Sequence, residues 1–216
     1  MIKTKSRGLF IVISGPSGAG KGTVCQKLIK SNPNIWLSVS ATTREKRPDE
    51  IDGENYFFIT KDQFIDKIEN GEFLEYAVVH NNQYYGTPKA KINEYLTKGR
   101  DVILEIDIKG ALQIKEAFPN SLFIFILPPS MSELKKRLIK RGTESKEKMI
   151  ERFKTSYKEI NEITKYNYVV VNDNLNAAVK KVNAIMIAEK CRVDRIEEVN
   201  LNNLEEELHE ILADIN

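Results

Sequence analysis

The sequence lacks the features of a secreted or membrane-spanning protein. Its 216 residues include only two cysteines, Cys25 and Cys191, which lie too far apart in sequence to form a metal-type cluster. No run of about eighteen apolar residues is present, so we expect no membrane span. Residues 1–7 contain no apolar stretch with a cleavage site. We therefore expect a reduced, cytoplasmic protein with inert thiols.

Positive charge is missing from one part of the chain. Residues 196–216 hold seven acids and no Lys or Arg, whereas the whole chain has 33 basic and 31 acidic residues. The remainder is therefore basic by about nine charges, which suits anionic ligands. No Lys/Arg run is interleaved with aromatic residues, so small phosphate ligands are favoured over nucleic acid. With 41% hydrophobic residues, a buried core is expected rather than disorder.

A glycine-rich stretch follows the apolar run 9–13 and precedes a helical pattern. Its glycines allow the backbone N–H groups to point inward, and a helix N-terminus favours anions. This context predicts a phosphate-binding loop for a nucleoside triphosphate, in preference to a turn without a ligand. The expected residues are Gly15, Pro16, Ser17, Gly18, Ala19, Gly20, Lys21, Gly22 and Thr23. The P-loop pattern has Ser or Thr at the position of Gly22, so the hydroxyl that contacts Mg²⁺, if any, is left open, with Thr23 as a candidate.

Continuous apolar runs alternate with helical patterns along most of the chain. This arrangement predicts a doubly wound α/β fold with a parallel sheet covered on both faces, and ligands at the carboxyl ends of its strands. The strands are expected at 9–13, 101–106, 122–127 and 168–171, with a weaker one at 36–40. The helices are expected at 21–31, 88–98, 109–117, 131–141, 146–165 and 174–189.

Three segments depart from this pattern. Residues 41–87 hold turn signals and short mixed runs, which predict a small antiparallel lobe containing a helix from Lys61 to Asn70, with Thr60 as N-cap and Gly71 after its end. Residues 138–166 are polar, basic and helical in pattern. The tail has apolar residues at helical spacing, which predict a helix that either docks on its own core or pairs with another subunit. These residues are Leu201, Leu204, Leu208, Ile211 and Ile215.

Phosphoryl transfer between nucleotides needs several cations around a compact negative charge. Besides Lys21, the sequence offers Arg44 and Arg47 just after the weak strand. A third group is Arg137 and Arg141, four residues apart on one helix face, with Arg152 on the next helix. The alternative for helix arginines is a solvated surface, but the loop around Arg44 has few apolar residues to pack against.

Taken together, these motifs resemble the guanylate kinase family, with the family's order and spacing from about residue 8 to 190. The matching segments are the glycine-rich loop, Ser38-Val39-Ser40-Ala41-Thr42-Thr43-Arg44 with Arg47, Gly53-Glu54-Asn55-Tyr56-Phe57-Phe58, Gly71-Glu72-Phe73-Leu74-Glu75-Tyr76, Tyr84-Tyr85-Gly86-Thr87, Leu104-Glu105-Ile106-Asp107 and Arg137-Leu138-Ile139-Lys140-Arg141-Gly142-Thr143-Glu144.

The resemblance implies a P-loop NTPase core, an inserted GMP-binding lobe and a helical lid within one domain. The core would be 1–40, 88–137 and 167–190, the lobe 41–87 and the lid 138–166. The resemblance also implies the substrates ATP and GMP, with dGMP as a further acceptor, and the cofactor Mg²⁺. Residues 191–216 fall outside the family's usual length and are expected to form a helical extension. The residues themselves, rather than the resemblance, predict no nucleic-acid or membrane partner, and the tail stripe leaves open a homo-oligomer through the C-terminal helix.

Site roles follow from the same resemblance. The GMP phosphate would be held by Arg44, Arg47, Tyr56 and Tyr85, and guanine by Ser40, Glu75, Thr87 and Asp107. The lid arginines 137, 141 and 152 would contact the triphosphate. The family often has Asp at the position of Glu105, which leaves the role of that acid open.

A carboxylate can accept two hydrogen bonds from guanine, whereas adenine offers neither donor, so Glu75 should reject AMP. Two rival hypotheses remain: a non-catalytic scaffold domain that binds phosphorylated proteins, and an enzyme with another acceptor. The retained Lys21 and lid arginines argue against the scaffold. Glu75, Ser40 and Thr87 argue against another acceptor.

Overall fold

The computed structural model describes residues 3–79, 82–140, 146–200 and 204–215. Its central sheet has five strands in the order β10-β9-β2-β8-β3, and every neighbouring pair is parallel. The expected doubly wound sheet is therefore confirmed. Its strands are β2 (Phe10–Ser14), β3 (Ile35–Leu37), β8 (Asp101–Glu105), β9 (Leu122–Leu127) and β10 (Tyr168–Val171).

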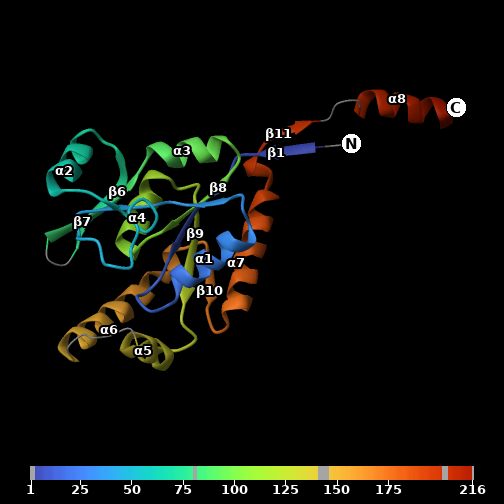
Figure 1. The fold of residues 1–216 in the computed structure, drawn as a ribbon. Helices are drawn as coiled ribbons and strands as arrows, with labels where there is room; N and C mark the ends of the chain where they lie inside the picture. Colours follow the sequence, from blue (N-terminus) through green and yellow to red (C-terminus); the bar gives the residue numbers. More distant parts are fainter. Residues whose placement is uncertain (1–2, 80–81, 141–145, 201–203, 216) are drawn as a thin grey trace.

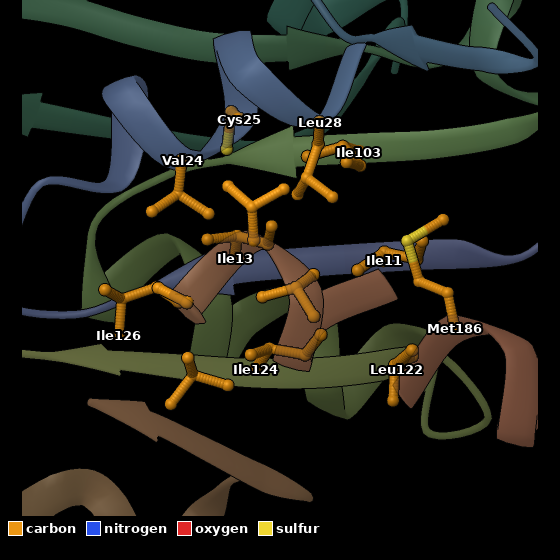
Figure 2. Packing of buried hydrophobic residues seen from close by; sticks show 14 of the residues in the cluster. Ile11, Ile13, Val24, Cys25, Leu28, Ile103, Leu122, Ile124, Ile126 and Met186 are labelled. Carbon is orange, nitrogen blue, oxygen red and sulfur yellow. The ribbon is translucent and has the colours of Figure 1, made fainter. Parts of the chain in front are cut away.

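The two faces of this sheet are buried by different helices, which explains why the strands are apolar throughout. Ile11 and Ile13 face a cluster formed with α1 (Lys21–Ser31) and α7 (Leu175–Lys190), shown in Figure 2. The alternate residues Phe10 and Val12 face a cluster formed with α3 (Ala90–Thr97) and α4 (Ile108–Ala117).

The remaining expected helices also form within a few residues of their predicted bounds. They are α5 (Met131–Lys140) and α6 (Lys146–Ile160). The last turn of the predicted 146–165 helix is a 3₁₀ segment, η2 (Asn161–Lys165), rather than α-helix. Helices α5 and α6 lie together at one end of the molecule in Figure 1.

The inserted segment forms its own four-stranded sheet in the order β5-β4-β7-β6, made of β4 (Ala41–Thr42), β5 (Phe57–Phe58), β6 (Phe73–Val79) and β7 (Gln83–Pro88). The expectation of an antiparallel lobe needs one correction, because β4 and β5 run parallel. A tight hairpin turn can join only antiparallel strands. The long loop 43–56 connects β4 to β5 instead, and it lets the two strands run in the same direction.

A helix, α2 (Lys61–Glu69), covers this second sheet. Its buried Phe64 stacks on Phe73, with ring centres 4.4 Å apart. The predicted Thr60 N-cap is confirmed, because its hydroxyl accepts from the Gln63 N–H while the Gln63 side chain accepts from the Thr60 N–H. This reciprocal capping fixes where the helix begins.

The two ends of the described chain pair in an antiparallel ribbon of β1 (Lys3–Ser6) and β11 (Ile196–Asn200), which follows η3 (Val193–Arg195). The prediction of a helical extension over 191–216 was therefore wrong for residues 196–200, which form a strand. Both strands are largely polar, so the partner at the other end of the chain, rather than a local apolar pattern, specifies them.

Helix α8 (Leu204–Ile215) follows the ribbon and lies beyond the main body in Figure 1. Leu208 and Ile211 are 54% and 56% exposed, so these two members of the predicted stripe do not dock on the core. Leu201 lies outside the described residues, as do the side chains of Leu204 and Ile215. Within the part of the chain described, no helix has the length and apolarity needed to cross a bilayer.

Candidate active site

The glycine-rich loop joins β2 to α1 at the carboxyl edge of the central sheet. Its Gly15 and Gly20 have φ of 144° and 92°, values that favour glycine. A Cβ on Gly15 would lie 2.2 Å from the Ile126 carbonyl oxygen, and one on Gly20 would lie 2.4 Å from Asn172 Nδ2. The loop therefore keeps its shape only because these two positions have no side chain.

Lys21 begins α1 and turns back over the loop. Its Nζ donates to the Gly15 carbonyl oxygen at 2.6 Å and to that of Pro16 at 3.4 Å. Burial lowers the pKa of Lys21, while the nearby carboxylates of Glu105, Glu159 and Asp107 oppose this shift. The ammonium group thus lies in the loop, surrounded by acids from three other elements.

Two adjoining cavities meet at this lysine. The first, of about 170 Å³, is lined by Gly15, Ser17, Gly18, Gly20, Lys21, Gly22, Glu105, Asp107 and Glu159. The second, of about 280 Å³, is lined by Lys21, Ser40, Tyr56, Glu75, Ala77, Tyr85, Gly86, Glu105, Ile106 and Asp107. Lys21, Glu105 and Asp107 line both, so the structure brings the glycine-rich loop next to most of the predicted GMP-binding residues.

Glu75 lies on β6 and is only 8% exposed. The fully buried Thr87 hydroxyl on β7 donates to Glu75 Oε1 at 2.6 Å. Burial raises the pKa of Glu75 to about 7, the Thr87 hydrogen bond opposes the shift, and the Asp107 charge adds to it. An acid that titrates near neutrality in a cavity is typical of a functional site.

Arg44 is held in a fixed orientation by its neighbours. Its Nη2 donates to Glu50 Oε1 at 2.7 Å, and its guanidinium lies 5.5 Å from the Tyr56 ring centre and 5.6 Å from that of Phe58. Glu50 Oε2 also accepts from the Arg47 backbone N–H at 2.8 Å. The Arg47 residue itself is exposed and does not line either cavity.

The lid arginines that are described contact the loop directly. Arg152 donates to Ser17 Oγ at 2.9 Å. Arg137 donates to the carbonyl oxygens of Ala19 at 3.4 Å and Asn172 at 3.1 Å, and its Nε pairs with Glu133. Arg141 lies outside the described residues.

A third cavity opens on the other side of the loop. It measures about 480 Å³ and is lined by Gly18, Gly20, Thr23, Arg137, Asn172, Asp173 and Leu175. Thr23 is exposed and belongs to this cavity, whereas Gly22 faces the Glu105 carboxylate: a Cβ there would lie 3.3 Å from Glu105 Oε1. The hydroxyl of Thr23 and the position at which the P-loop pattern has its hydroxyl, Gly22, thus face different spaces.

Several residues of the site were missed by the sequence analysis. Asn172 directly follows β10 and its side chain donates to the Ala19 carbonyl oxygen at 2.9 Å, a role that its place at a strand end could have suggested. Glu50 and Glu159 gave no such signal. Asp107, predicted to approach guanine, also caps α4 by accepting from the Gly110 N–H at 2.9 Å.

Comparisons with known proteins agree with this geometry. The family model described as guanylate kinase matches residues 7–189. A guanylate kinase of Clostridium tetani is 60% identical over 208 residues, covering 96% of this chain and 99% of that protein. One of Caldanaerobacter subterraneus is 56% identical over 202 residues, covering 94% and 98%. The crystal structure of guanylate kinase from Anaplasma phagocytophilum is 33% identical with a TM-score of 0.75, covering 90% of this chain and 92% of that one. The chain belongs to the guanylate kinase family.

Proposed function

We propose that this protein transfers the γ-phosphoryl group of ATP to GMP, and to dGMP, giving ADP and the nucleoside diphosphate. One observation carries the proposal: Lys21, Glu105 and Asp107 line both the loop cavity and the cavity that holds Glu75. A donor triphosphate on the loop and an acceptor phosphate in the second cavity would meet at Lys21. Holding the two phosphates in line is the main requirement of this chemistry.

The acceptor base would be read by Glu75, with Ser40 and Thr87 as neighbouring hydroxyls. The ionised carboxylate accepts from guanine N1–H and from the 2-amino group. AMP supplies neither donor and would leave a buried carboxylate unpaired, a loss of roughly 1–3 kcal/mol or more for a charged group. Asp107 would approach the same edge of the base.

The phosphates would be held by two sets of residues. Arg44, Arg47, Tyr56 and Tyr85 would bind the GMP phosphate, and the contact between Arg44 and Tyr56 supports a shared role for these two. The triphosphate would accept hydrogen bonds from backbone N–H groups of the loop 15–23, which exclude Pro16, and would contact the arginines 137, 141 and 152. The hydrogen bonds of Arg137 and Arg152 to the loop support this assignment.

We propose that Mg²⁺ enters this site bound to the phosphates of ATP. Among the described residues no group of three or more His, Cys, Asp or Glu side chains could hold a metal ion. Mg²⁺ is usually bound by phosphates, waters and one or two carboxylates. Glu105, Asp107 and Glu159 line the loop cavity and are the nearby carboxylates, and Thr23 offers a hydroxyl. When bound, the ion would neutralise charge that develops on the phosphates.

We also propose that residues 41–87 and 138–166 move as a GMP-binding lobe and a lid over a core formed by 1–40, 88–137 and 167–190. Closure would exclude water and so limit ATP hydrolysis. We further propose that two copies pair through α8. The proposal also includes a cytoplasmic location and no nucleic-acid partner. The exposed Leu208 and Ile211 support the pairing.

A coupled assay of ADP formation with GMP, dGMP, AMP and UMP tests the activity. We expect turnover with GMP and dGMP and little with AMP. Turnover with none of the four would favour the scaffold hypothesis, and turnover with AMP or UMP alone would favour another acceptor. In Glu75→Gln, the preference for GMP over AMP should fall at least tenfold. An unchanged preference would remove Glu75 from base recognition.

A further inference from the structure

A separate apolar cavity lies where the inserted lobe meets the core. It has a volume of about 300 Å³ and is lined by Trp36, Val39, Ala41, Phe57, Ile59, Lys67, Pro88, Ala90 and Lys91. Trp36 belongs to β3 and Lys91 to α3, whereas Phe57 and Lys67 belong to β5 and α2 of the lobe. Binding sites for small molecules are commonly apolar pockets of this size between domains.

This cavity is distinct from the proposed GMP cavity but shares a wall with it. Ser40 lines the GMP cavity, while Val39 and Ala41 on either side of it line the apolar one. Successive side chains of an extended chain point to opposite faces. The segment 39–41 therefore separates the two spaces, and a ligand on one side would press on the backbone that forms the other.

The charge on the lining has a single sign. Among the described residues that line it, Lys67 and Lys91 are the charged ones, and none is an acid or carries a hydroxyl. Lys91 Nζ, on the core, lies 5.9 Å from the centre of the Phe57 ring, on the lobe. Lys67 pairs with Glu72 at 2.7 Å, but both side chains are more than a third exposed, so this ion pair is weak and exchangeable.

We propose that this cavity binds an amphipathic anion, with its apolar body against Trp36, Val39 and Phe57 and its acidic group beside Lys91 and Lys67. The apolar walls supply binding energy through the area they remove from water. The two ammonium groups select a negative head group over a neutral or positive one. Trp36 itself is fixed by Tyr95 of α3, with ring centres 4.5 Å apart.

The chain's only tryptophan lines the cavity, which makes a direct test possible without any activity measurement. Decanoate serves as the probe and 1-decanol as its neutral counterpart, with Trp36 fluorescence as the readout. We expect a saturable change with decanoate and at least tenfold weaker binding of 1-decanol. No saturable change with decanoate, or equal affinity for the two compounds, would overturn the proposal.

Two variants check that the probe binds in this cavity. Lys91→Glu should weaken decanoate at least tenfold, and Ala90→Phe, at an exposed lining position, should fill the mouth and abolish binding. The matched control is Lys98→Glu, at the exposed end of the same helix and outside the cavity, which should change affinity less than twofold. Equal losses in Lys91→Glu and Lys98→Glu would show binding by general charge alone, against the proposal.

The shared wall predicts coupling to the acceptor, a consequence that depends on the function proposed above. Saturating GMP should change the decanoate affinity measured by Trp36, and decanoate should change the apparent GMP affinity by the same factor. If decanoate binds but GMP leaves its affinity unchanged, the coupling is refuted and the binding site stands. Failure of the proposed function would instead appear in the acceptor assay without decanoate.

Discussion

The two adjoining cavities are built in different ways. The loop cavity is formed mainly by six residues of the short segment 15–22, whose backbone shape is set by glycines packed against Ile126 and Asn172. The acceptor cavity is formed by side chains from separate elements, with a buried acid, Glu75, held by Thr87. Backbone amides bind any phosphate in the same way, whereas discrimination between bases needs side chains.

The largest effect is expected for Lys21→Met, which removes the cation common to both cavities. Loss of a positive charge on the transferring group should lower kcat by about 10³-fold or more. The measurement is ADP formation at saturating ATP and GMP. Lys27→Met, an exposed position on the same helix, is the control and should retain near-normal turnover. A near-normal rate in Lys21→Met would contradict the role of this lysine.

Gly20→Ala tests whether the loop depends on backbone shape alone. The new methyl group would be placed 2.4 Å from Asn172 Nδ2 at a φ of 92°, so either the loop or the Asn172 side chain that holds the Ala19 carbonyl oxygen must shift. Misplacement of the loop by about 1 Å can cost about 10²-fold in rate.

The matched control for this loop variant is Gly99→Ala. Gly99 has a φ of 74°, but no atom lies within 4 Å of the point that a Cβ would occupy there, so this variant carries the backbone strain of roughly 1–2 kcal/mol without the clash. The melting temperature should fall in both variants, and further in Gly20→Ala because of the clash, whereas kcat should fall only in Gly20→Ala. Equal rates would show that the loop tolerates a side chain at position 20.

The acceptor cavity should respond to pH where the loop cavity does not. With a pKa of about 7, Glu75 is increasingly protonated below neutrality and can then no longer accept both hydrogen bonds from guanine. The KM for GMP should therefore rise by up to about tenfold per pH unit below pH 7, while the KM for ATP should change much less. Glu75→Gln is the control, because only the titration of the GMP phosphate remains in that variant. Parallel profiles in both proteins would exclude Glu75 as the titrating group.

The same shift predicts an effect on stability. The pKa of Glu75 is raised above its ordinary value of 4.5, so the folded protein binds more protons than the unfolded chain between that value and about 7. Stability is then lost as pH rises through this window, by up to about 3 kcal/mol. Glu75→Gln should melt at a higher temperature than the parent at pH 8, with a smaller difference at pH 5. A constant difference would contradict the buried ionisation.

A smaller effect is expected for Thr87→Val, which keeps the shape but removes the hydroxyl that donates to Glu75 Oε1. Losing a hydrogen bond to a charged group costs about 1.5–3 kcal/mol, and part of this should appear as a roughly tenfold higher KM for GMP at pH 7. Thr87→Ser retains the donor and should stay close to the parent. If Val and Ser at this position gave the same KM, the hydroxyl would have no role in holding the acid.

Local patterns were sufficient to predict the central sheet, its covering helices and the loop, because apolar runs, helix caps and glycine spacing each depend on residues that are close together in the sequence. They could not predict the β1–β11 ribbon, whose polar strands are specified by each other across almost the whole chain. Nor could they find Glu50, which became visible only once the fold brought its carboxylate to Arg44. Apart from Arg44 and Arg47, which were predicted from their place after a strand, the predicted site residues near the acceptor came from the family resemblance.

The ribbon has a consequence for how the molecule is made. Because β1 pairs with a strand nearly two hundred positions later, the first strand has no partner while the ribosome is still translating the body. The matched family region, 7–189, is complete before that partner emerges. Residues 7–189 can thus fold during synthesis, and β1 can pair with β11 only after that.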